Sequence, residues 1–308
     1  RALAVRAGCA PEEVLPFSTG VVGERLALEP FAEAIDTALD NLDDDGWTRA
    51  ARAIMTTDTV PKGVSRRFEA DGRTFTVTGI VKGAGMMHPD MATMLAFVAT
   101  DANVAEPLLE AALERAVRLS FNRISVDGDT STNDACILVA TGAHATDAIE
   151  PGSDPAAAFS ETLTEVCTWL AQAIVRDGEG ATKFITIDVE EGRDEAECLR
   201  LAFLVAHSPL VMTAMYASDA NWGRILAVVG RAGLEDLDID AVRIHLGDVR
   251  IVSGGARDPE YTEEQGQRVM SRDEISVTIA LGRGSARATV WTSDLSHEYV
   301  TINAEYRT

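Results

Sequence analysis

A threonine chemistry is the catalytic arrangement that remains for this sequence once the commoner catalytic patterns are excluded. Thr93 follows a glycine-bearing loop, residues 82–92, and precedes the apolar run 94–98. A threonine hydroxyl is a weak nucleophile, but a threonine exposed as a new N-terminus can pass its proton to its own α-amino group, whose ordinary pKa is about 7.7–8.0. The attacked carbonyl then needs hydrogen-bond donors for its oxyanion. The residues alone favour a structural interpretation, because β propensity explains a threonine where a strand begins.

Other catalytic and metal-binding patterns are missing from the sequence. It contains no GxSxG elbow, no phosphate-binding GxxxxGK[ST] loop and no HExxH. Residues 127–138 resemble a calcium loop, but Thr132 replaces the required glycine and Leu138 the required glutamate, so a turn is the better interpretation. His88 and the other histidines are isolated, and the four cysteines are scattered without CxxC spacing. We therefore predict no metal, no cofactor and no disulfide framework.

The charge and hydropathy of the chain exclude several classes of partner. The 308 residues carry a formal net charge of -22, which repels nucleic acid and anionic membranes. Hydrophobic residues make up 46% of the chain, no apolar run could span a bilayer, and the first residues do not resemble a signal peptide. A cytoplasmic globular protein is predicted. Lysine occurs only at Lys62, Lys82 and Lys183, and by residue type alone each is expected to be solvated.

The pattern of helices and strands indicates an α/β fold. We expect a two-lobed, layered α/β sandwich with largely antiparallel or mixed sheets, in which residues 1–177 form a first lobe and 178–308 a second. Apolar spacing predicts helices at 30–42, 47–55, 106–121, 154–177, 194–206 and 219–232. In the fourth of these, Asp154 is the expected N-cap. Strands are predicted at 67–70, 74–78, 94–98, 184–189, 275–281 and 286–292, with Asp71–Gly72 turning one hairpin and 282–284 turning the last pair.

Several blocks of the chain together resemble one enzyme family. The loop Lys82-Gly-Ala-Gly-Met, followed by Pro89-Asp-Met-Ala-Thr-Met-Leu, is similar to the self-cleavage signature of the ornithine acetyltransferases, the bifunctional glutamate N-acetyltransferases of arginine biosynthesis. The resemblance runs from about Pro16 to the last residue. Further blocks follow in the family's order, at 17–23, 54–58, 120–134, 178–183, 221–225 and 303–308.

The resemblance implies a function and a set of site residues. The bond between Ala92 and Thr93 would be broken by the Thr93 hydroxyl, and Thr93 would then carry acetyl from N-acetylornithine to glutamate. Thr19 and Gly20 would form the oxyanion hole. The substrate-binding positions that the family implies are Thr56, Lys82, Thr93, Glu179, Asn303 and Thr308.

Charge supports two of these roles. Lys82 could pair with a substrate carboxylate, and Glu179 could receive the cationic amine of ornithine. The family further implies an assembly of two copies of each cleaved chain. Whether acetyl-CoA also serves as an acetyl donor is left open by the sequence.

The chain departs from the family pattern at three places. Asp90 stands where asparagine is usual, and a carboxylate there would oppose a developing oxyanion. Met212 replaces an expected lysine. The family has a further segment before Arg1, so we expect a fragment or a truncated chain. Two alternatives therefore stay open: an aminopeptidase-like threonine hydrolase of related fold, and an inactive truncated homologue.

Overall fold

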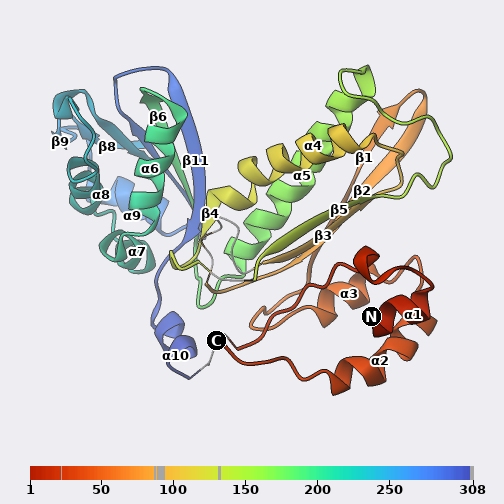
Figure 1. Cartoon of the computed structure of the whole chain (residues 1–308). Helices are drawn as coiled ribbons and strands as arrows, with labels where there is room; N and C mark the ends of the chain where they lie inside the picture. Colours follow the sequence, from red (N-terminus) through yellow and green to blue (C-terminus); the bar gives the residue numbers. More distant parts are fainter. Residues whose placement is uncertain (22, 87, 89–93, 131–132, 306–308) are drawn as a thin grey trace.

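The chain folds into two lobes, each built around a β-sheet (Figure 1). The computed structural model describes residues 1–21, 23–86, 88, 94–130 and 133–305. Within this part of the chain the smaller sheet has four strands in the order β1-β2-β3-β5. Its strands are β1 (Lys62–Ala70), β2 (Arg73–Lys82), β3 (Leu95–Thr100) and β5 (Ala135–Ala140). The predicted hairpin between β1 and β2 is confirmed, with Asp71 and Gly72 at φ of 51° and 73°.

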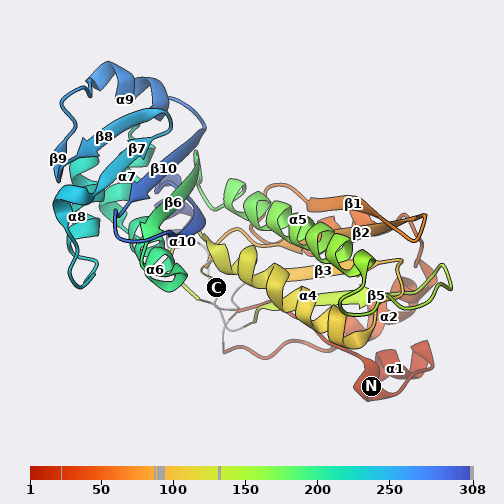
Figure 2. The same ribbon diagram turned by 90° about the horizontal axis from the view of Figure 1, so that it is seen from above.

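Two long helices cover one face of the four-stranded sheet (Figure 2). They are α4 (Glu106–Leu119) and α5 (Asp154–Arg176). The predicted helix at 154–177 is confirmed, and the large apolar side chains on one face of α5 are fully buried: Phe159, Leu163, Val166, Leu170 and Ile174. The predicted cap is wrong by one residue, because Ser153 occupies the N-cap position and Asp154 is already helical. An acidic side chain in the first turn still favours the helix.

The N-terminal helices lie on the opposite side of the same sheet (Figure 1). These are α1 (Ala2–Ala7), α2 (Glu29–Asp40) and α3 (Trp47–Ala53), and the last two match the predicted helices. A groove of about 1140 Å³ separates α2 and α3 from β2 and β3. Among the described residues before Thr56, only Ala4 and Ala51 are buried. This region therefore contributes little to the hydrophobic core.

The larger sheet has seven strands in the described part of the chain, in the order β4-β11-β6-β10-β7-β8-β9. Its strands are β4 (Ile124–Ser125), β6 (Phe184–Gly192), β7 (Arg243–Leu246), β8 (Val249–Ser253), β9 (Ala256–Arg257), β10 (Glu274–Ala280) and β11 (Ala286–Ser293). The predicted pairing of the last two strands is wrong. The turn at 282–284 joins β10 to β11, but these two strands do not pair with each other. Strand β6 lies between them, parallel to β10 and antiparallel to β11.

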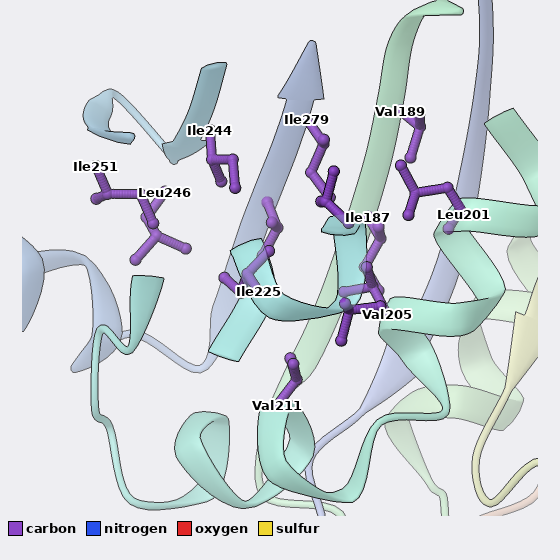
Figure 3. Packing of buried hydrophobic residues seen from close by; sticks show 14 of the residues in the cluster. Ile187, Val189, Leu201, Val205, Val211, Ile225, Ile244, Leu246, Ile251 and Ile279 are labelled. Carbon is purple, nitrogen blue, oxygen red and sulfur yellow. The ribbon is translucent and has the colours of Figure 1, made fainter. Parts of the chain in front are cut away.

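Four helices accompany the larger sheet: α6 (Glu195–Ala206), α7 (Pro209–Tyr216), α8 (Trp222–Gly230) and α9 (Glu263–Met270). Leu201 and Val205 of α6, Val211 of α7 and Ile225 of α8 meet Ile187 of β6 in a closely packed core (Figure 3). Helix α6 begins where the Asp194 side chain accepts the N–H of Glu197. A last helix, α10 (His297–Glu305), follows β11 and returns toward the first lobe (Figure 1).

The observed architecture confirms an α/β fold with mixed sheets. Strand β4 precedes residue 177 in the chain but pairs with β11 in the larger sheet. The boundary at 177/178 stays a prediction. No single helix among the described residues has the length and hydropathy to cross a membrane, although the bent pair of α6 and α7 meets both criteria when taken together.

Candidate functional site

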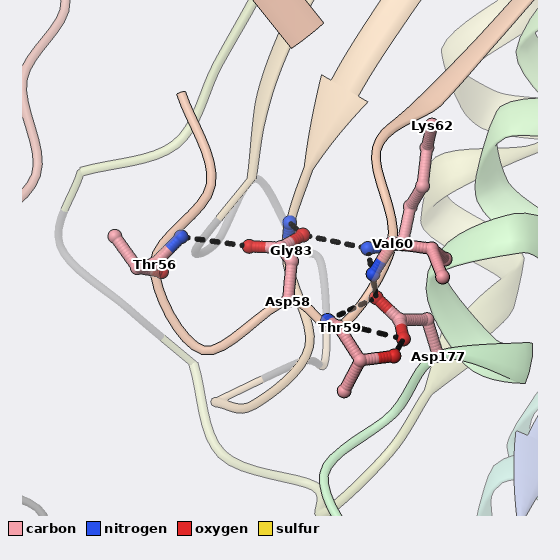
Figure 4. A network of polar contacts seen from close by, with 7 residues as sticks. All are labelled: Thr56, Asp58, Thr59, Val60, Lys62, Gly83 and Asp177. Atoms are coloured by element: carbon pink, nitrogen blue, oxygen red, sulfur yellow. Dashed lines mark hydrogen bonds and ion pairs between the residues drawn. The ribbon is translucent and has the colours of Figure 1, made fainter. Parts of the chain in front are cut away.

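The glycine-bearing loop that leaves β2 is fixed at its start by a buried network of charges (Figure 4). The Lys62 ammonium bonds Asp58 at 2.6 Å and also bonds Asp177. The three side chains are no more than 5% exposed. Asp58 additionally accepts the N–H groups of Thr56 (3.0 Å) and Gly83 (2.7 Å). One carboxylate therefore ties the Thr56 segment to the loop.

This network corrects the expectation that a lysine is solvated here, because Lys62 is only 2% exposed. Asp177 holds the segment after Asp58 through the N–H and hydroxyl of Thr59. Burial of Asp58 favours its neutral form, but the Gly83 N–H and the Lys62 ammonium outweigh this and hold the pKa of Asp58 below its usual value. Each of the three charged side chains has at least two hydrogen-bond partners, which offset the cost of burying the charges.

Lys82, the last residue of β2, is the second buried lysine, at 4% exposure. Burial lowers the pKa of its ammonium, while the carboxylates of Asp58, Asp134 and Glu179 act in the opposite direction. Among the described residues Lys82 makes no salt bridge within 4.0 Å. A buried ammonium in that position is suited to bind an anionic group of a ligand.

Glu179 lies over the same loop and is 7% exposed. Its N–H donates to Ala84 O (2.8 Å), and its carboxylate accepts from Asn303 Nδ2 of α10 (2.9 Å). A methyl group added at Gly85 would lie 2.4 Å from the Glu179 carboxylate, so Glu179 could keep this position only beside a glycine. Lys82, Glu179 and Asn303, three of the predicted substrate-binding residues, are thus brought together.

Helix α10 packs against the turn that contains Glu179 and Gly180. Ser296 Oγ donates to Gly180 O at 2.6 Å and accepts the N–H of Tyr299 at 3.2 Å. Gly180 has φ of 67°, and a Cβ there would lie 2.4 Å from the Tyr299 nitrogen. Only glycine allows this close approach, which places Asn303 against Glu179.

Two carboxylates of the 120–134 block hold the other parts of the loop. Asp127 Oδ2 accepts the N–H of Met86 (2.7 Å) and the hydroxyl of Tyr299 (3.4 Å). Asp134 Oδ1 accepts the N–H of Met94, the residue directly before β3. Burial raises the pKa of Asp134 to about 7, although the Met94 N–H and Lys82 favour its charged form. The prediction of a turn in this block missed both roles.

His88 joins the loop to the larger lobe. Its ring lies 4.5 Å from the His207 ring and 4.8 Å from the Phe203 ring, both belonging to the α6 region. Burial, together with His88, lowers the pKa of His207 to about 4, so His207 is neutral at pH 7. Its Nε2 lies 2.9 Å from Ser125 Oγ. These contacts give His88 a structural role, because its ring packs between the loop and α6.

The other predicted site residues are not brought to this place by the described contacts. Thr56 is exposed and is linked to the loop through Asp58. Thr19 and Gly20 are exposed, and the ring of Phe17 packs 5.7 Å from that of Phe97 on β3. The predicted Ala92, Thr93 and Thr308 lie outside the described residues, as does Asp90.

Met212, which replaces an expected lysine, is 5% exposed in α7. Its backbone oxygen accepts the N–H of Leu295 at 3.3 Å, at the segment that leads from β11 to α10. The residue therefore contributes to the packing between α7 and this connection. No group of three metal-ligating side chains is found among the described residues, and the absence of a metal or cofactor stays a prediction.

Comparisons with known proteins identify the family that the chain resembles. The model of the ArgJ family matches residues 1–308. The arginine biosynthesis bifunctional protein ArgJ of Methylococcus capsulatus is 59% identical over 307 residues, which are 100% of this chain and 75% of that protein. Proteins of the same name from Pseudomonas fluorescens and Pseudomonas syringae are each 54% identical and are covered to 76% of their length.

A solved structure agrees with these relatives. The crystal structure of the arginine biosynthesis bifunctional protein ArgJ from Bacillus halodurans matches with a TM-score of 0.65 and 36% sequence identity. The match covers 68% of this chain and 98% of that chain. With the family model spanning all 308 residues and relatives above 50% identity, this chain belongs to the ArgJ family.

Proposed function

We propose that the chain is a glutamate N-acetyltransferase that moves acetyl from N-acetylornithine to glutamate in arginine biosynthesis. The observation that carries this proposal is the buried pair of opposite charges at one loop, the Lys82 ammonium and the Glu179 carboxylate. Such a pair is complementary to an amino acid that carries both a carboxylate and an ammonium group. The names of the relatives, bifunctional proteins of arginine biosynthesis, support the same reaction.

In the first step the chain would cleave itself. The Thr93 hydroxyl attacks the carbonyl carbon of Ala92, the peptide bond breaks to leave an ester, and water hydrolyses that ester. The products are chains 1–92 and 93–308, the second of which begins with the free α-amino group of Thr93. That amine, with an ordinary pKa of about 7.7–8.0, is the base that the hydroxyl needs.

Acetyl transfer then proceeds in two half-reactions. The Thr93 hydroxyl loses its proton to the α-amino group and attacks the acetyl carbonyl of N-acetylornithine, and ornithine leaves with that proton. The amine of glutamate next attacks the acetyl ester and restores the hydroxyl. Thr19 and Gly20 are proposed to stabilise the oxyanion in both steps, through a hydroxyl and a backbone N–H.

The substrate positions follow from charge. Lys82 is proposed to bind the substrate carboxylate, and Glu179, oriented by Asn303, the side-chain ammonium of ornithine. Thr56 and Thr308 complete the proposed site. We further propose a cytoplasmic assembly of two copies of each cleaved chain. Use of acetyl-CoA as an additional donor would be consistent with the word bifunctional in the relatives' names.

An acetyl-transfer assay tests the proposal. Purified protein is incubated with N-acetylornithine and glutamate, and N-acetylglutamate and acetate are measured separately. The proposal predicts N-acetylglutamate in amounts equal to the ornithine released, and none with Thr93→Ala. Acetate as the main product would instead identify a hydrolase.

Exchange of Lys82 for methionine tests the substrate site. Loss of a charge-assisted hydrogen bond should raise the KM for glutamate about 10-fold or more, with a smaller change in kcat. The matched control is Lys183→Met, because the Lys183 ammonium bonds Ser218 Oγ (2.9 Å) in the larger lobe. An unchanged KM in Lys82→Met would remove Lys82 from the pocket.

A further inference from the structure

Met94, which directly follows the proposed nucleophile, is hydrogen-bonded through both its N–H and its C=O to the segment Asp134–Ala135. Asp134 Oδ1 accepts the N–H of Met94, and the N–H of Ala135 donates to Met94 O at 3.0 Å. The nitrogen of Met94 is also the amide nitrogen of the peptide bond that joins Thr93 to Met94. Fixing both polar groups of Met94 restricts the φ and ψ torsions of Met94 itself. The side chain of Asp134 thus acts next to Thr93.

Asp134 has a second carboxyl oxygen that the fold does not use. Within the described part of the chain, Asp134 Oδ2 is buried and has no hydrogen-bond partner. It lines a cavity of about 210 Å³ between α4 and the start of β5, together with Asn122, whose buried Oδ1 also has no partner among the residues that the structure describes. Leaving a buried oxygen unsatisfied is costly, so a residue kept in this state calls for an explanation.

The surroundings of Asp134 include one cation that belongs to the proposed substrate pocket. In the sheet, Lys82 of β2 pairs with Leu95 of β3, and Leu95 pairs on its other side with Ala135, the residue after Asp134. Lys82 and Asp134 therefore flank the same residue of β3, and each favours the charged form of the other. The titratable groups that share the cavity are Glu114 on α4 and Cys136 on β5. Burial raises the pKa of Cys136 to about 12, so this thiol stays neutral near pH 7.

We propose that Asp134 is a positioning residue, which fixes the backbone immediately after Thr93 and couples that fixation to the charge at Lys82. When a substrate carboxylate pairs with Lys82, the field of the ammonium at Asp134 is partly cancelled. The neutral carboxylic acid is then favoured, and Asp134 takes up a proton from solvent while it still accepts the Met94 N–H. Substrate binding and the nucleophile segment are linked in this way.

Other charges near Lys82 set the background for this coupling. Asp58 and Glu179 favour the charged ammonium, and Lys62 opposes it. Asp58 is bonded to Lys62 and to backbone N–H groups, and Glu179 to Asn303. Neither of these carboxylates bonds Met94, so the link to the segment after Thr93 is specific to Asp134.

The inference rests on the proposed function, and two variants test it. Asp134→Ala removes the acceptor, while Asp134→Asn keeps a neutral acceptor of the same shape. Self-cleavage and kcat should fall at least 10-fold in the alanine variant, with the KM for glutamate changed less than about threefold. The asparagine variant should keep both within about threefold of wild type. Glu114→Gln, at the same cavity, is the control and should behave as wild type.

Proton uptake separates a positioning role from a merely structural one. Glutamate binding is measured by calorimetry near pH 7 in buffers of different ionisation enthalpy. Wild type should take up a larger fraction of a proton than Asp134→Asn, and this comparison decides the case where Asp134→Ala does not fold. Equal uptake by the two proteins would overturn the coupling.

The failures of the two proposals can be told apart. A cleaved and active wild type with an equally active Asp134→Ala overturns the positioning role alone. A wild type that stays uncut and transfers no acetyl overturns the proposed function, and the positioning role with it.

Discussion

Two buried carboxylates, Asp58 and Asp134, hold the two ends of the loop between β2 and β3 in different ways. Asp58 accepts the N–H of Gly83 where the loop begins, and Asp134 accepts the N–H of Met94 where it ends. Asp58 is also neutralised by Lys62, whereas one oxygen of Asp134 has no partner among the described residues. Their pKa values consequently move apart, below the ordinary value for Asp58 and to about 7 for Asp134.

The two carboxylates therefore have different roles at one loop: Asp58 stabilises the fold, whereas Asp134 can change its charge near neutral pH. A carboxylate with a direct cationic partner and backbone donors stays charged over the whole physiological range and fixes the fold. A carboxylate that is buried without such a partner changes charge near neutral pH and can respond to a ligand. Lys82 interacts electrostatically with both carboxylates.

The largest expected effect is a loss of stability when the charge network at the Asp58 end of the loop is disrupted. Lys62→Met leaves Asp58 and Asp177 buried without their shared ammonium, which should cost about 3–5 kcal/mol in the free energy of unfolding. Urea unfolding monitored by circular dichroism measures the loss. A cost below about 1 kcal/mol would show that the network does not stabilise the fold.

Asp58→Asn should have the next largest effect, a loss of about 2–3 kcal/mol, because Lys62 keeps Asp177 but the Gly83 anchor is weakened. The pH dependence is also informative. Since the folded pKa of Asp58 lies below its ordinary value of 3.8, its stabilisation is present above that value and is lost as the pH falls through the folded pKa. The variant should therefore lose less stability on acidification than wild type does, and a parallel decline in the two proteins would argue against the assignment.

Asp134→Asn should reverse this sign and sharpen the contrast. Its folded pKa of about 7 lies above the ordinary value of 3.8, so its contribution is present below pH 3.8 and is lost as the pH rises toward 7. Because solvent partly screens this half-buried carboxyl, wild type should lose on the order of 1 kcal/mol between pH 5 and 8 relative to the variant. Melting temperatures across this range provide the measurement, and identical pH profiles would contradict the raised pKa.

The smallest effect is expected at an exposed ion pair. Arg176 Nε lies 3.0 Å from Glu274 Oε1, and the two side chains are 41% and 63% exposed. Glu274→Gln should change the free energy of unfolding by less than about 0.5 kcal/mol, because solvent screens the pair. A loss comparable to that of Lys62→Met would mean that burial is not what distinguishes the network, and the same urea titration decides.

Local sequence signals predicted much of the fold and missed what depends on distant contacts. The hairpin at Asp71–Gly72 and the buried face of α5 follow from turn chemistry and helical spacing. The insertion of β6 between β10 and β11 does not, because pairing of strands far apart in the chain leaves no local period. Helix α7 was missed, since it is short and mostly apolar.

The site was predicted in the same partial way. The resemblance identified Lys82, Glu179 and Asn303, which the structure brings together. It did not identify Asp58 and Asp134, although both lie inside the blocks that carried the resemblance. Their roles depend on backbone N–H groups 25 and 40 residues away, and a side chain's backbone partner cannot be read from its residue type.

Intact-mass spectrometry of the purified protein tests the central claim most directly. Two chains, 1–92 and 93–308, are expected, with an additional acetyl group on Thr93 after brief incubation with N-acetylornithine. Thr93→Ala should give one chain of 308 residues and no acetyl adduct. A wild type that stays as a single unmodified chain while it transfers acetyl would contradict a nucleophile made by cleavage before Thr93.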